Sequence, residues 1–227
     1  MHINTFFQRI PDAPECEAIL PYWRASWRFH EWTPRVFGLS FAENHPKFKE
    51  LAAHVSKFPT VNNPIYEKLC WLRWLCAASM YSQDWTLWCD TDVINRNMPA
   101  IDFSEAIRSR SLAYPAHYFC AEDFKSPVTG ILSISRAFVT RYLIDGVLAL
   151  DPANLPGEIV VNGQRHFSDM LWFGQLASNG LLQYIKADIG YPNLSAMPAI
   201  VHCAYNECLS LGRKKLDVIK ELTNQNT

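Results

Sequence analysis

The amino-acid sequence predicts an α/β fold with helices on both sides of a sheet. Short apolar stretches of strand propensity alternate with longer stretches of helical periodicity, which is the pattern of that class. The chain has 227 residues, enough for one large hydrophobic core. It carries no internal repeat, no low-complexity tract and no Gly/Ser linker. We therefore expect a single domain over residues 1–227.

The first half of the chain supplies the better-marked elements. Asn63 suits a helix N-cap, and Pro64 suits the first helical position, where a missing N–H is harmless. Apolar and small residues then recur at helical spacing up to residue 79. Residues 85–89 are short, apolar and rich in Trp, which favours a strand. Further strands are expected at residues 3–7 and 35–41, and further helices at 19–30 and 46–57.

The second half continues the alternation. Ser168 is a plausible N-cap for a helix that begins Asp169-Met170. We expect the remaining strands at residues 128–134, 184–186 and 199–203. A helix is expected at residues 137–149, and a basic helical tail at 206–227.

Composition excludes several functional classes. There are 21 Lys and Arg residues against 22 Asp and Glu, and no basic stripe of the kind that nucleic-acid binding requires. No apolar run approaches the roughly 20 residues that span a bilayer. The first residues resemble no secretory signal, and the seven cysteines match no zinc spacing and read as buried thiols. We expect a soluble, cytoplasmic protein without nucleic-acid partners.

The most informative stretch is WTLWCDTDV, residues 85–93. An apolar strand runs directly into Asp90 and Asp92, and side chains two apart in an extended chain project to the same side. Ligands of open α/β sheets bind at the carboxyl ends of strands. Two adjacent carboxylates repel one another unless a cation lies between them. The pair therefore predicts a site for Mn²⁺ or Mg²⁺ that also holds phosphate, on an exposed loop; a polar turn after a strand is the alternative.

Other chemistries with the same letters fit less well. An EF-hand loop requires Gly at its sixth position, which is Asn95 here. A dehalogenase-type phosphatase usually has its D-x-D near the amino terminus, whereas Asp90 comes late in this chain. A metal-dependent phosphatase or nucleotidyltransferase is therefore kept only as the second interpretation. The abundant aromatic residues leave a non-catalytic carbohydrate-binding domain as a third. From the residues alone, the chain is a phosphate-handling α/β domain that uses a divalent metal.

The order of motifs resembles that of the GT-A-fold, metal-dependent glycosyltransferases with a DxD motif. The stretches that carry the resemblance cover most of the chain: YEKLCWLRWLCAA, DTDV, VTGILSISR, FSDMLWF and AIVHCAY. The resemblance implies one GT-A-like domain with a mixed, mostly parallel central sheet. It further implies that residues 1–100 bind the nucleotide, up to the DxD motif, and that residues 101–227 bind the acceptor and end in a helix.

The resemblance also implies roles for individual residues. Asp92 and His202 would bind the metal, and Asp90 would contact the metal shell or the ribose. Arg73 would hold Asp90 or the nucleotide. Asp169 would act as general base or hold a sugar hydroxyl. The other residues implied at the donor and acceptor are Thr129 and Gly130 beneath the sugar, Lys214 of the basic run 213–215 on the diphosphate, and Asp123, next to Glu122, as an alternative base.

The activity implied is transfer of a sugar from a UDP- or GDP-linked donor to a glycan or other hydroxyl acceptor. A metal would neutralise the charge that develops on the departing diphosphate. A histidine ligand would favour Mn²⁺ over Mg²⁺.

Overall fold

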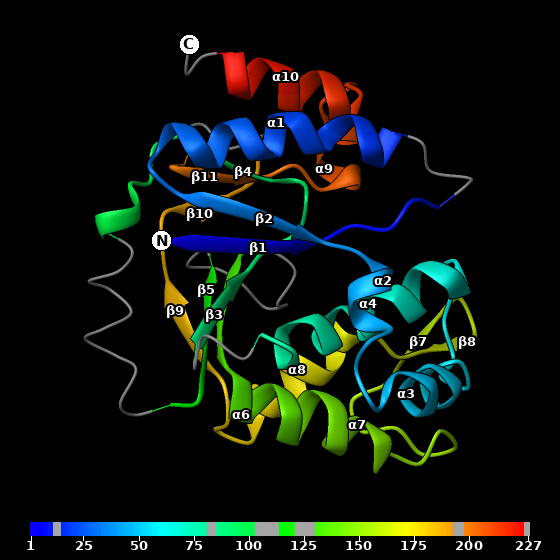
Figure 1. Ribbon diagram of the computed structural model, residues 1–227. Helices are drawn as coiled ribbons and strands as arrows, with labels where there is room; N and C mark the ends of the chain where they lie inside the picture. The colour runs from blue at the N-terminus through cyan, green and yellow to red at the C-terminus, as the bar shows by residue number, and fades with distance from the viewer. Residues whose placement is uncertain (11–14, 81–84, 103–113, 121–129, 193–197, 225–227) are drawn as a thin grey trace.

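The computed structural model describes residues 1–10, 15–80, 85–102, 114–120, 130–192 and 198–224, and it confirms the α/β class (Figure 1). A six-stranded central sheet has the order β2-β1-β3-β6-β5-β9. Its strands are β1 (His2–Phe6), β2 (Thr33–Phe37), β3 (Trp85–Trp88), β5 (Ala116–Cys120), β6 (Ile131–Ser135) and β9 (Gln183–Lys186).

The sheet is mixed and mostly parallel, as predicted. β1 runs parallel to β2 and to β3, and β5 runs parallel to β9. β6 is antiparallel to both of its neighbours, β3 and β5. Within this sheet β6 therefore runs against the other five strands, and β1, β2 and β3 end at the same edge.

A smaller sheet joins distant parts of the chain beside that edge. It has the order β10-β11-β4, from Ile189–Gly190, Ile200–His202 and Val93–Asn95. β4 starts directly after the Asp90-Thr91-Asp92 triplet, and its antiparallel register pairs Val93 with His202. The pairing places His202 next to the triplet across more than 100 residues of sequence. A separate hairpin consists of β7 (Ile159–Val161) and β8 (Gln164–His166).

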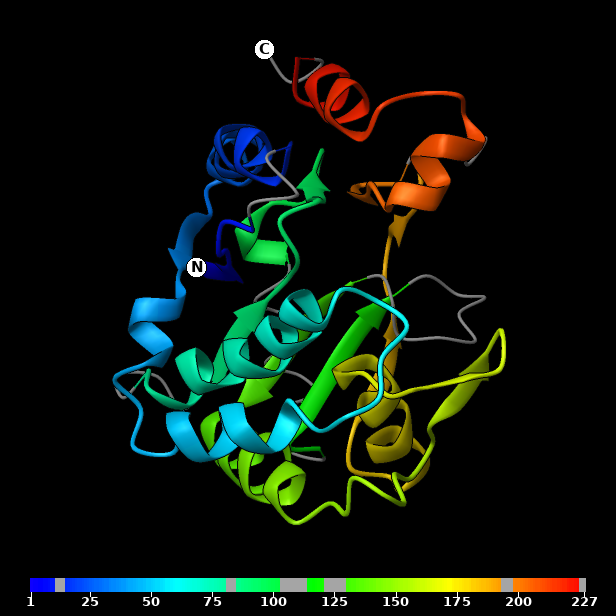
Figure 2. The same ribbon diagram turned by 90° about the vertical axis from the view of Figure 1, so that its right-hand side faces the viewer.

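Helices cover both faces of the central sheet (Figures 1 and 2). On one face lie α1 (Glu15–Phe29) and α10 (Lys215–Asn224), which pack against each other, with α9 (Tyr205–Ser210) nearby. The other face carries α4 (Pro64–Ala78) and α8 (Asp169–Ser178), with α2 (Leu39–Ala42) and α3 (Phe48–Val55) packed on α4. A continuous helical segment completes this face and consists of α6 (Arg136–Phe138), the π-helix η1 (Val139–Asp145) and α7 (Gly146–Leu148).

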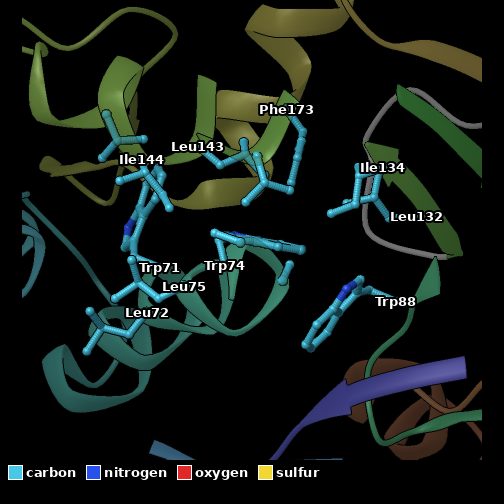
Figure 3. Packing of buried hydrophobic residues seen from close by; sticks show 14 of the residues in the cluster. Trp71, Leu72, Trp74, Leu75, Trp88, Leu132, Ile134, Leu143, Ile144 and Phe173 are labelled. Atoms are coloured by element: carbon cyan, nitrogen blue, oxygen red, sulfur yellow. The ribbon is translucent and has the colours of Figure 1, made fainter. Parts of the chain in front are cut away.

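Alternating strand residues divide the core between the two faces. In β3, Trp88 packs on the α4 side and Leu87 on the α1 side, as expected for side chains that alternate along a strand. Helix α4 lies within the core on that side, and its Trp71, Leu72 and Trp74 are almost completely buried. Figure 3 shows these side chains packed against residues of β3, β6, η1 and α8. The base of the site is therefore rigid.

Most predicted elements form within a few residues of their expected bounds, with two corrections. The strand expected at 35–41 ends at Phe37, because the chain turns at Gly38 and continues as α2. The tail is two helices and not one, because Gly212 has φ +65°, which interrupts a helix. The first residues of the strand expected at 128–134 lie outside the described residues.

Within the described ranges, no helix has the length and apolar character needed to cross a membrane.

Candidate active site

Asp90 and Asp92 follow β3 at the carboxyl edge of the sheet, but they face different partners. The side chain of Asp90 is 46% exposed and contacts Arg73 of α4. The side chain of Asp92 is only 13% exposed and contacts His202 and Lys215. The prediction that Asp92 lies on an exposed loop is therefore wrong, because β11 and the start of α10 cover it.

Arg73 joins the triplet to the start of α8. Its Nη1 donates to Asp90 Oδ1 at 2.5 Å, while Nε and Nη2 both donate to Asp169 Oδ2, at 3.2 and 2.7 Å. A planar guanidinium can hold two carboxylates in this way, whereas an ammonium cannot present the same fork. The contact of Arg73 with Asp90 is one of the two that the sequence led us to expect, and the structure adds Asp169 to the pair.

Asp169 is 3% exposed and is held by more than Arg73. Trp74 Nε1 also donates to its Oδ2, at 3.1 Å. Ser168 caps α8, and the placement of Asp169 in the first turn favours a negative charge there. Burial raises the pKa of Asp169 above its usual range, and the Arg73 guanidinium opposes that rise. Three donors on one oxygen hold this carboxylate in a fixed position.

Asp92 forms the second charged group of the site. Lys215 forms an ion pair with its Oδ2, and His202 Nε2 lies 3.4 Å from its Oδ1. Burial by itself would raise the pKa of Asp92, but Lys215 and His202 outweigh burial and hold that pKa far below its usual range. Burial by itself would lower the pKa of His202, and the nearby Asp92 carboxylate raises it instead.

The chemistry of Asp92 and His202 fits a divalent cation. Asp92 Oδ1 is buried and has no hydrogen-bond partner among the described residues. Neighbouring ligands held at about 2.1 Å from one ion in octahedral geometry lie about 3.0 Å apart, so the 3.4 Å between Asp92 Oδ1 and His202 Nε2 would shorten by a few tenths of an ångström around an ion. In the part of the chain that the structure describes, however, no three His, Cys, Asp or Glu side chains are arranged around one ion. The shared role of Asp90 in metal binding stays a prediction.

Two hollows meet at the Arg73–Asp90 pair, because Phe6, Arg73 and Asp90 line both of them. The first lies beyond the end of β1, and its other lining residues include Gln8, Tyr66, Cys70, Thr91, Asp92 and Lys215. The second lies over β6 beside Asp169, and its other lining residues include Trp74, Trp88, Tyr118, Gly130, Met170 and Phe173. One hollow is thus charged and the other mostly aromatic.

Gly130 lines the aromatic hollow, and its expected place beneath the sugar stays a prediction. A Cβ built on Gly130 would lie 1.8 Å from the carbonyl oxygen of Phe119, a backbone atom that cannot swing aside. Only glycine allows strand β6 to begin this close to β5.

The remaining predicted residues are placed as follows. Lys214 is exposed, and Lys215 is the residue of the basic run that reaches the triplet. Arg213 is ion-paired with Glu221 of α10 at 2.5 Å. Asp123, Glu122 and Thr129 lie outside the described residues.

Sequence reasoning missed Trp74 and Gln8. Trp74 donates to Asp169, and only a pairing across 95 residues reveals that role. Tyr66 lies seven residues before Arg73, about two turns of one helix, and as that spacing predicts, both residues line the charged hollow. Gln8 follows β1, and the shared carboxyl edge of the parallel strands was the signal that could have found it.

The mixed central sheet, with charged side chains at the carboxyl edge where β1, β2 and β3 end, defines the class of structure. The chain has the GT-A glycosyltransferase fold. No protein-family model matches the sequence, and no curated protein matches it either. Solved structures of glycosyltransferases match it over nearly its whole length.

Three of these structures illustrate the likeness. A glycosyltransferase involved in glycosylation of the major capsid of PBCV-1 has TM-score 0.53 at 14% identity, covering 97% of this chain and 98% of that chain. Mouse xyloside xylosyltransferase 1 has TM-score 0.56 at 8% identity, covering 91% and 98%. The galactosyltransferase LgtC, solved with donor and acceptor sugar analogues, has TM-score 0.56 at 11% identity, covering 99% and 96%. At such identities the likeness is one of fold.

Proposed function

We propose that the chain is a glycosyltransferase that moves a sugar from a nucleoside-diphosphate donor, UDP- or GDP-linked, to an acceptor hydroxyl. The observation that carries this proposal is the division of the D-x-D pair. Asp92 belongs to a group that suits a cation and phosphate, while Asp90 is tied through Arg73 to Asp169 beside the aromatic hollow. A sugar diphosphate has a charged part and a ring part, and it needs both environments side by side.

The charged hollow would hold the nucleoside diphosphate. Asp92 and His202 would bind Mn²⁺ in preference to Mg²⁺, because imidazole is a better ligand for manganese. Such a metal, when bound, supplies Lewis-acid stabilisation of the leaving diphosphate. Lys215 would lie near the phosphates, with Lys214 at the rim. Residues 1–100 would form most of the nucleotide side, and residues 101–227 the acceptor side.

The aromatic hollow has a volume of ≈ 30 Å³, about that of one water molecule, so it would take only one edge of the donor sugar beside Gly130. Asp169 would contact a sugar hydroxyl, since three donors already occupy one of its oxygens and fix its position. A general base must accept a proton, and Asp169 Oδ2 already accepts three hydrogen bonds, so we assign Asp169 to holding a hydroxyl and not to proton abstraction. Asp123 is then the candidate base on the acceptor side, if the reaction inverts the anomeric centre.

A thermal-shift experiment tests the donor part of the proposal. A ligand that binds only the folded state raises the melting temperature. UDP or GDP should raise it strongly with Mn²⁺ and only slightly without the metal, while AMP and inorganic phosphate should not. A metal-independent shift, or a shift with phosphate alone, would favour the phosphatase or nucleotidyltransferase reading. The variant Asp92→Asn should lose the metal-dependent part, and Asp151→Asn, on an exposed loop, should keep it.

A further inference from the structure

A third recess lies on the far side of α4 from the charged hollow. It is enclosed by the end of α3, the connection from α3 to α4, and the first turns of α4. Its volume is ≈ 240 Å³, and a water molecule occupies about 30 Å³ of liquid, so a ligand much larger than water has room. The residues that line its apolar part are Val55, Phe58, Pro64, Ile65, Trp71 and Phe167.

One carboxylate in this recess has an unsatisfied oxygen. Glu67 is 7% exposed, and its Oε1 accepts a hydrogen bond from Asn62 Nδ2 at 2.7 Å. Its Oε2 is buried and has no hydrogen-bond partner among the described residues. A buried polar atom without a partner is destabilising, so such atoms are rare in folded proteins. Because Oε2 has almost no accessible surface, the Glu67 side chain has to turn toward the recess, where a ligand hydroxyl would supply the missing donor.

The surroundings of Glu67 suit a neutral hydroxyl. Burial raises the pKa of Glu67 to about 7, with Asn62 opposing the rise and Asp169 adding to it. A hydroxyl group can donate to the carboxylate and accept from the acid, so it matches both protonation states near neutral pH. The apolar lining matches the C–H faces of a sugar ring. Together these features match a carbohydrate.

The recess shares a helix stripe with the active site. Glu67, Trp71 and Trp74 are spaced four and three residues apart, so they lie along one face of α4. Trp71 lines the recess, and Trp74 donates to Asp169. Seven residues of helix span about 10 Å, so the recess lies about that far from the proposed sugar-binding carboxylate. That distance suits the second unit of a chain more than the reacting unit.

We propose that this recess binds a sugar unit of the acceptor, with Glu67 Oε2 accepting one of its hydroxyls, so that the acceptor is a neutral glycan of at least two linked units. The inference rests on the proposed glycosyltransferase function and names the substrate class of its acceptor. It also extends the acceptor side beyond residues 101–227, because all residues that line the recess except Phe167 belong to residues 1–100.

The experiment measures binding of lactose, maltose, cellobiose and xylobiose to the full chain by saturation-transfer NMR and by thermal shift, without donor. At least one disaccharide should bind, and more tightly than its component monosaccharides. Glu67→Leu should weaken that binding about tenfold or more, while Glu67→Gln, which keeps one acceptor oxygen, should lose less. Glu50→Leu, at an exposed acidic position on α3, is the matched control and should bind like the parent protein.

Equal affinity in Glu67→Leu and the parent protein would overturn the inference, and so would the absence of binding by all four disaccharides. UDP and GDP binding with Mn²⁺, measured on the same samples, separates the two proposals. If a nucleotide binds and Glu67→Leu has no effect, only the acceptor inference fails. If neither nucleotide binds, the proposed function fails, and the acceptor inference that rests on it fails too.

Discussion

Arg73 and Asp169 are joined by two hydrogen bonds to one carboxylate oxygen, at 3.2 Å from Nε and 2.7 Å from Nη2. Both side chains are largely buried, and the third nitrogen of the guanidinium continues to Asp90. Through this contact the start of α8 is tied to the triplet that follows β3. The charged hollow and the aromatic hollow are therefore joined by the same residue, which lines both.

The first prediction concerns that fork. Arg73→Lys should lower the free energy of unfolding by about 2–4 kcal/mol, because one ammonium cannot satisfy Asp90 and the buried Asp169 together. Urea unfolding measures the change. Arg165→Lys is the control, since its exposed pair with Glu158 contributes little to stability. Equal stability of Arg73→Lys and the parent protein would show that the network does not hold the site together.

The second prediction concerns Lys215, whose ammonium forms an ion pair with Asp92 Oδ2. Lys215→Met should raise the affinity of the nucleotide-free protein for Mn²⁺ about threefold to tenfold, because the metal no longer displaces a cation from Asp92. Electron paramagnetic resonance of free Mn²⁺ measures the affinity. Lys214→Met, at the exposed neighbouring residue, should leave it unchanged. Weaker Mn²⁺ binding in Lys215→Met would contradict this account of Asp92.

The third prediction is a pH dependence that comes from Glu67. Its pKa is about 7 in the folded state and about 4.3 in an unfolded chain. Below about pH 4 the carboxyl is protonated in both states and has no effect. Between these two values the unfolded state ionises first, so the free energy of unfolding falls as the pH rises, and it levels off above pH 7.

Glu67→Gln removes that titration. The variant should be about 1–3 kcal/mol more stable than the parent protein at pH 7.5 and similar to it at pH 4. Urea unfolding at the two pH values gives the comparison. A stability difference that is the same at both pH values would mean that Glu67 has an ordinary pKa.

The fourth prediction concerns the floor of the aromatic hollow. Gly130→Ala should destabilise the protein by about 2–4 kcal/mol, because its Cβ would collide with the carbonyl oxygen of Phe119. Gly174→Ala is the matched control, since its Cβ within α8 meets no atom within 4 Å and alanine favours helix. That control should be equal to the parent protein or slightly more stable. Thermal unfolding of the two variants tests this prediction. Equal melting temperatures would contradict the close approach of residue 130 to the carbonyl oxygen of Phe119.

Local signals explain which parts of the fold the sequence could predict. Asn63 and Pro64 mark the start of α4, and the structure shows Asn63 Oδ1 accepting from the backbone N–H of Ile65 and Tyr66. The Trp-rich stretch before Asp90 is strand β3 as predicted. The N-cap position of Gly38 and the left-handed φ of Gly212 were overlooked, so one strand was predicted too long and two helices were predicted as one.

The site was predictable in its parts and in only some of its pairings. Asp90, Asp92, Arg73, Asp169 and His202 were each identified from the sequence, and the contact of Arg73 with Asp90 was one of the two expected for that arginine. The contact of Arg73 with Asp169 crosses 96 residues, and local patterns do not encode it. The alignment of β4 with β11 buries Asp92, and an extended D-x-D pattern gave no sign of that burial.

The central claim is that the bond broken lies between a sugar and a nucleoside diphosphate. Supplied with UDP- and GDP-sugars, Mn²⁺ and no acceptor, the protein should slowly release UDP or GDP from its correct donor, because water can enter the acceptor side. Asp92→Asn should lose this release, and Asp151→Asn should retain it. Chromatographic analysis of the nucleotide products is the measurement. Release of UDP or GDP together with free sugar is the predicted result, whereas products limited to UMP, GMP or inorganic phosphate would contradict the account.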